Sequence, residues 1–92
     1  MKLGNWELDN IKTANLPQKA QSAFTAVTSS LVGVDYQPVL YVGHQLVNGT
    51  NHCILALQRI VIPDEEYRLV KIIIHEDLNG AASLNSISGV AL

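Results

Sequence analysis

Two Asn-Gly pairs, Asn48-Gly49 and Asn79-Gly80, each follow a run of residues that favours a β-strand. Asn-Gly between two such runs is the strongest short-range signal for a hairpin, because a type I′ turn needs positive φ at both central residues. The pairs therefore predict two tight hairpins and an antiparallel sheet in the second half of the chain. The expected strands are residues 36–47, 52–62, 67–75 and 83–92, the last at the edge of the sheet or partly frayed.

A single amphipathic helix is expected before these strands. Its apolar residues follow a 3.6-residue period: Leu16, Ala20, Ala23, Phe24, Val27 and Leu31. Pro17 suits the first turn, and Gly33 follows the last periodic residue, where a left-handed C-cap is favoured. The apolar face must be buried against the sheet. We therefore predict one α+β domain over residues 1–92, with one long helix packed across an antiparallel sheet of four to five strands.

Composition excludes several classes of protein. The chain is 48% apolar and 15% charged with a net charge of −2, which argues against intrinsic disorder. No basic stripe is present, so nucleic acid is not an expected partner. The longest apolar runs are too short to span a bilayer, and no membrane association is expected. We expect a cytoplasmic protein, because no signal peptide is visible; a secreted form whose signal has been removed stays open.

Three histidines and a lone cysteine raise the question of a metal or thiol site: His44, His52, His75 and Cys53. A two-residue loop in the first hairpin would place His44 opposite Cys53. Zinc needs at least three protein ligands, and the only carboxylates nearby in sequence are Glu76 and Asp77. We predict no metal and no cofactor. No orienting Asn or Asp accompanies a Cys-His pair, so we also predict that the protein is not an enzyme.

The first hairpin carries a motif that resembles a known family. Gln45-Leu46-Val47-Asn48-Gly49 is similar to the Gln-x-Val-x-Gly signature of the cystatins, and it follows a single long helix as it does there. Leu78-Asn79-Gly80 resembles the second hairpin of the disulfide-free, stefin-like branch, and Gly4-Asn5-Trp6 resembles the N-terminal segment. Asn79 stands where that branch has a turn proline, and no tryptophan marks the second hairpin.

The resemblance implies a cystatin-like fold and reversible inhibition of papain-like cysteine proteases. The N-terminus and the two hairpins would block the active-site cleft without any cofactor. The implied protease contacts are Gly4, Gln45, Leu46, Val47, Asn48, Gly49, Leu78, Asn79 and Gly80. Leu46 and Val47 offer apolar area, and Gly49 allows close approach of the backbone.

A second function remains open, because Asn-Gly turns are common in β-proteins and a fold does not imply a function. Strand residues are apolar on both faces: Ile54, Ala56 and Ile60 on one, and Cys53, Leu55, Leu57 and Val61 on the other. One helix covers only one face of a sheet. We therefore expect Leu55, Leu57 and Ile73 to be covered by a second copy, in a homodimer formed through the outer sheet face or by strand exchange at the first turn. The alternative function is thus a non-inhibitory interaction or self-association module.

Overall fold

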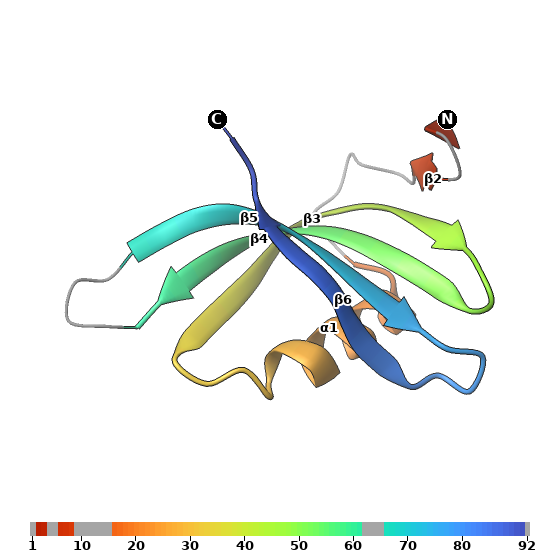
Figure 1. Cartoon of the computed structure of the whole chain (residues 1–92), viewed down its shortest axis with the longest axis horizontal. Coiled ribbons are helices and arrows are strands. Elements are labelled where there is room, and N and C mark those ends of the chain that lie inside the picture. The colour runs from red at the N-terminus through yellow and green to blue at the C-terminus, as the bar shows by residue number, and fades with distance from the viewer. Residues whose placement is uncertain (1, 4–5, 9–15, 62–65, 92) are drawn as a thin grey trace.

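The computed structural model describes residues 2–3, 6–8, 16–61 and 66–91 and has one helix against a curled antiparallel sheet (Figure 1). The elements are β1 (Lys2–Leu3), β2 (Trp6–Leu8), α1 (Gln18–Thr28), β3 (Val34–Leu46), β4 (Thr50–Ile60), β5 (Glu66–Glu76) and β6 (Ala82–Gly89). The sheet order is β1-β2-β3-β4-β5-β6, so each strand pairs with its neighbours in the chain. The predicted α+β class and the meander of four long strands are confirmed, with two short strands added at the β3 edge.

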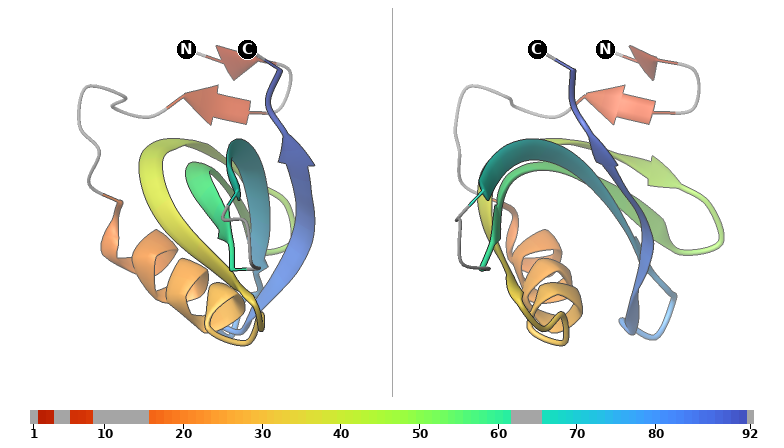
Figure 2. Two further views of the ribbon diagram at one scale, coloured as in Figure 1. Left: turned by 90° about the vertical axis from the view of Figure 1, so that its left-hand side faces the viewer. Right: turned by 60° about the vertical axis from the view of Figure 1, so that its left-hand side comes forward.

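The hydrophobic core lies between α1 and the concave face of the sheet (Figure 2). The helix contributes its predicted face, and its buried residues are Ala20, Ala23, Phe24 and Val27. The sheet contributes Tyr41, Ile54, Ala56, Val70, Ile72 and Ile74. Buried positions alternate with less buried ones along β5, as expected for a strand whose faces differ in solvent access.

The helix is shorter than the apolar period predicted. It has 11 residues, begins after the N-cap Pro17 and ends at Thr28, whereas the sequence indicated residues 16–31. The Thr28 hydroxyl donates to the Phe24 carbonyl oxygen at 2.8 Å. Hydroxyl side chains that bond nearby carbonyls compete with helical hydrogen bonds, which explains an end at this point. Among the described residues, no helix has the length and apolarity needed to cross a bilayer.

Gly33 does not cap the helix, which corrects the sequence-based expectation. Its φ is +79°, but it lies in the connection to β3, beyond the C-cap residue Ser29. Its carbonyl oxygen accepts a hydrogen bond from the Val61 N–H at 3.0 Å. The glycine therefore serves the turn into β3 and ties that turn to the end of β4.

The outer, convex face of the sheet is less open than the sequence suggested. Leu55, Leu57 and Ile73 are half-buried, and Cys53 is buried. β1 and β2 lie on the side of the sheet opposite α1 (Figure 2). β2 extends the β3 edge through the pairs Glu7–His44 and Leu8–Gly43. Cover of the outer face by a second copy stays a prediction.

Candidate functional site

The tips of two hairpins lie next to each other at one end of the sheet (Figure 1). The first tip joins β3 to β4 and the second joins β5 to β6. Together they line a shallow hollow of about 510 Å³, whose walls include Leu46 and Gly49 from the first tip and Leu78, Asn79 and Gly80 from the second. Five of the nine residues implied by the cystatin resemblance are therefore brought together at one surface.

The first tip is a three-residue loop, not the two-residue type I′ turn that Asn-Gly predicted. Leu46 pairs with Thr50, so Val47, Asn48 and Gly49 form the loop. Only Gly49 has positive φ, at +109°, and Asn48 does not. The Val47 N–H donates to the Gly49 carbonyl oxygen at 3.0 Å. A loop of three residues with a glycine near its end is the next most common hairpin connection.

Gly49 makes the contact between the two tips. A Cβ at this position would lie 2.5 Å from the backbone oxygen of Glu76 and 3.0 Å from His75 Cε1. Such separations are far below normal van der Waals contact, so only glycine fits here without displacement. The missing side chain at Gly49 therefore lets the first tip approach the end of β5.

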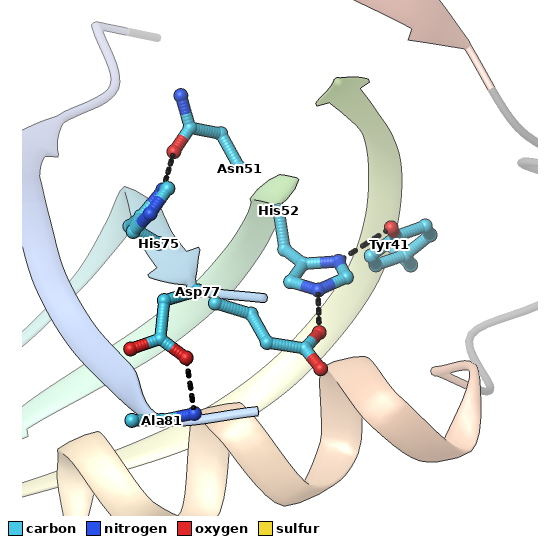
Figure 3. A network of polar contacts seen from close by, with 7 residues as sticks. Tyr41, Asn51, His52, His75, Asp77 and Ala81 are labelled. Carbon is cyan, nitrogen blue, oxygen red and sulfur yellow. Dashed lines mark hydrogen bonds and ion pairs between the residues drawn. The ribbon is translucent and has the colours of Figure 1, made fainter. Parts of the chain in front are cut away.

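The second tip is organised by one carboxylate. Asp77 accepts hydrogen bonds from the N–H groups of Asn79 and Ala81, each at 2.9 Å, and Figure 3 shows the bond to Ala81. The Asp77 N–H donates to the Ala81 carbonyl oxygen at 2.9 Å, which closes the loop. Gly80 has a φ of +86°, which suits a glycine. An aspartate that bonds the next N–H groups is a common way to fix a turn.

Apolar side chains project from both tips. Leu46 is 76% exposed, Leu78 is 79% exposed and Val47 is 37% exposed. Isolated exposed leucines are common, but leucines on two adjacent loops form a local apolar surface. The tips are held by their own hydrogen bonds, so they can bind with little loss of loop entropy.

A buried polar network supports the tips from the concave side. His52 Nδ1 lies 2.8 Å from the Tyr41 hydroxyl and His52 Nε2 lies 2.9 Å from Glu76 Oε1 (Figure 3). With the ring proton on Nε2, the imidazole donates to the carboxylate and accepts from the phenol. These contacts join β3, β4 and β5. Glu76 ends β5, so the network fixes the strand end from which the second tip begins.

A second polar row crosses the outer face at the same level. Gln45, Asn51 and His75 occupy paired positions on β3, β4 and β5. Asn51 Nδ2 donates to Gln45 Oε1 at 2.9 Å, and Asn51 Oδ1 lies 2.9 Å from His75 Nδ1. Because this amide oxygen is an acceptor, His75 Nδ1–H is the donor. Gln45, which the resemblance marks as a contact residue, is thus held in place by its neighbour.

The structure pairs two of the histidines that raised the question of a metal site, but not with Cys53. His44 lies opposite His52, and Cys53 lies opposite Gly43, so the expected pairing of His44 with Cys53 is wrong. The three-residue loop shifts the register by one position, which accounts for the difference. Within the described ranges, no three side chains of His, Cys, Asp or Glu gather as a metal site would need. Burial raises the pKa of the Cys53 thiol, and the positive charge of Lys71 partly opposes this.

Sequence reasoning did not identify the buried polar network. The contacts of His52 with Tyr41 and Glu76 join side chains 11 and 24 positions apart, and no local motif indicates them.

The N-terminal part of the implied contact surface is only partly described. Gly4, which the resemblance places in the contact surface, lies outside the described residues. β2 pairs with β3 at Gly43 and His44, close to the first tip, so the N-terminal segment approaches the same end of the sheet.

Comparison of the chain with protein-family models, with curated proteins and with solved structures gave no match.

Proposed function

We propose that this chain is a cystatin-like, reversible inhibitor of papain-like cysteine proteases that inserts its two hairpin tips into the active-site cleft. The observation that supports this most strongly is the adjacency of Leu46 and Leu78 on two loops that line one hollow. The Gln45–Gly49 motif lies on the first of these loops. The cystatin resemblance implies that the second loop, 30 residues further along the chain, belongs to the same surface.

The physical basis of inhibition is occlusion of the cleft. A protease cleft accepts extended backbone and apolar side chains, and burial of one leucine contributes about 1.5–3 kcal/mol. Both tips are preorganised: Asp77 holds the second, and the close approach at Gly49 holds the first against it. A preordered surface loses little conformational entropy on docking, which favours tight binding. Inhibition of this kind needs no nucleophile, base or metal.

The test is titration of papain with the chain, read from the rate of hydrolysis of a fluorogenic peptide. We expect reversible inhibition by the wild type. Leu46→Asp and Leu78→Asp should each raise the inhibition constant about 10- to 100-fold, because apolar burial is lost and a charge must be desolvated. The matched control is Val32→Asp: Val32 is 96% exposed and precedes β3 at the end remote from the tips.

The outcomes distinguish the loss of a protease contact from the loss of the folded structure. All three variants should fold like the wild type, because each changes an exposed side chain. Equal inhibition by Leu46→Asp and Val32→Asp would exclude the first tip from the contact surface. Absence of inhibition by the wild type at micromolar concentration would remove the proposal itself.

A second candidate function is a non-inhibitory interaction module. The observation that favours it is the outer face, where Leu55, Leu57 and Ile73 keep part of their apolar surface open to solvent. A hollow of about 490 Å³ on the part of the sheet remote from the tips is also lined by Leu57, together with Pro38 and Tyr67. This function predicts that binding to a partner depends on Leu57 and not on Leu46.

A further inference from the structure

β6 forms a free edge of the sheet. The strand order ends at β6, and six of its eight residues are exposed. Of the described strands, only β5 pairs with β6, and α1 contacts β6 from the concave side of the sheet (Figure 2). The opposite edge is β1, which has only 2 residues. A long, open edge is a template for another β-strand, because half of its backbone donors and acceptors point away from the sheet.

The direction of these backbone groups follows from one hydrogen bond. The Val90 N–H donates to the Leu69 carbonyl oxygen at 3.0 Å, so Val90 faces β5. Backbone direction alternates along a strand, and Ser88 and Ser86 therefore also direct their N–H and C=O groups to β5. Ile87 and Gly89, between them, direct theirs outward. These two residues offer a short ladder of hydrogen-bonding groups at the edge.

The sequence of β6 lacks the charged and proline residues that usually protect such an edge. Residues 82–91 contain no charged residue and no proline. One protective feature is present: the register passes from Ile74–Leu84 to Ile73–Ser86, so Asn85 is an extra residue in a bulge. The bulge leaves residues 86–89 as the regular part of the edge.

We propose that β6 pairs antiparallel with β6 of a second copy of this chain, about a two-fold axis at Ser88, so that Ile87 of each copy lies opposite Gly89 of the other. When a strand pairs with its own copy about a two-fold axis, any charged residue near the axis comes close to the same charge on the other strand, which is repulsive. β6 has no charged residue, so it can pair with its own copy without this repulsion. Ser88 would face Ser88 of the second copy on the outer side of the joined sheet, where hydroxyl pairs form cross-strand hydrogen bonds.

The dimer differs from the two forms that the sequence suggested. It uses neither the outer sheet face nor an exchange of strands at the first hairpin. So short a ladder buries less than the roughly 1,200 Å² typical of stable complexes, so association should be reversible and in the micromolar range. The paired strands run in opposite directions, which points the hairpin tips of the two copies away from each other. The proposal is therefore independent of protease inhibition.

The first test removes a single outward N–H. Gly89→Pro deletes the N–H that would bond the partner and leaves the bonds to β5 intact, and proline is tolerated on an edge whose N–H faces solvent. Gly89→Ala is the matched control, since its Cβ would be 3.6 Å from Arg68 Nη1, an ordinary contact. Sedimentation equilibrium from about 10 μM to 1 mM should show a monomer–dimer equilibrium for wild type and Gly89→Ala, and at least tenfold weaker association for Gly89→Pro.

The second test places like charges across the two-fold axis. Ser86→Lys with Ser88→Lys should abolish the dimer at low salt, with partial recovery at 0.5 M salt because the repulsion is screened. Ser22→Lys with Thr25→Lys adds the same charge on the exposed face of α1 and should leave the dimer intact. Circular dichroism checks that each variant is folded.

Three results would overturn the proposal. One is a wild type that stays monomeric at about 1 mM, far above the expected dissociation constant. Another is a dimer that neither the Gly89→Pro variant nor the Ser86→Lys, Ser88→Lys variant weakens. The third is a dimer that does not dissociate within minutes of dilution, since slow dissociation indicates strand exchange, which requires unfolding.

Discussion

Gly49 and Glu76 are in close backbone contact: a Cβ on Gly49 would lie 2.5 Å from the Glu76 carbonyl oxygen. The first residue belongs to the loop after β3 and the second ends β5, so the contact joins the two hairpins at their tips. Two loops with exposed leucines thereby form one surface. The absence of a side chain at a single position is what allows this approach.

Gly49→Ala should destabilise the fold more than Gly80→Ala. Both glycines have positive φ, +109° and +86°, so each substitution costs about 1–2 kcal/mol in backbone strain. A Cβ at Gly80 meets nothing within 4 Å, whereas one at Gly49 meets backbone atoms that cannot rotate away. We expect an additional loss of about 1–3 kcal/mol at Gly49 from overpacking, measured as the free energy of unfolding in urea. Equal losses for the two variants would show that the tips are not in contact.

Phe24→Ala should lower the free energy of unfolding by about 3–5 kcal/mol. Phe24 is 3% exposed and packs between α1 and the sheet, so the substitution opens a cavity in the core. Thr25→Ala, on the exposed side of the same helix, is the control and should change stability by less than about 0.5 kcal/mol. An unfolding midpoint in urea equal to that of the wild type would show that Phe24 does not face the core.

Tyr41 and His52 should show energetic coupling in a double-mutant cycle. Tyr41→Phe keeps the ring and removes the hydroxyl, while His52→Leu removes the imidazole that lies 2.8 Å from it. If the hydrogen bond contributes to stability, the two losses will not add, and the interaction energy will be about 0.5–3 kcal/mol. Urea unfolding of the wild type, both single variants and the double variant gives this value. Additive losses would mean that the pair contributes nothing to holding the tips.

The stability of the wild type should fall at alkaline pH partly through Cys53. Burial raises the pKa of this thiol above its ordinary value of 9.0, so the unfolded chain loses the proton first as the pH rises. The stabilisation is complete below the unfolded pKa and is lost as the pH rises through the folded pKa. Cys53→Ala should therefore lose less stability than wild type between pH 8 and pH 10, measured by urea unfolding. The same slope in both proteins would contradict a raised thiol pKa.

The sequence was informative wherever a structure depends on neighbouring residues. The apolar period identified Ala20, Ala23, Phe24 and Val27 as the buried helix face, and all four are buried. The Asn-Gly pairs located both hairpins. The errors were also local. The helix ends at Thr28, where a side-chain hydroxyl bonds a helix carbonyl, and the apolar period does not indicate such a bond. The first turn has three residues, because Asn-Gly is compatible with more than one turn length.

For the described part of the chain, local sequence alone determined one amphipathic helix, a meander of four long strands and two glycine-containing turns, since periodicity and turn chemistry act over a few residues. Tertiary structure decided what those turns do together. Curling of the sheet and the one-position shift in register set Gly49 against Glu76, aligned His52 with the end of β5 and left β6 at an open edge. Gly49 and Glu76 are 27 positions apart in the sequence, and His52 and Glu76 are 24 apart. Only the pairing of strands in space brings residues so far apart in the sequence into contact.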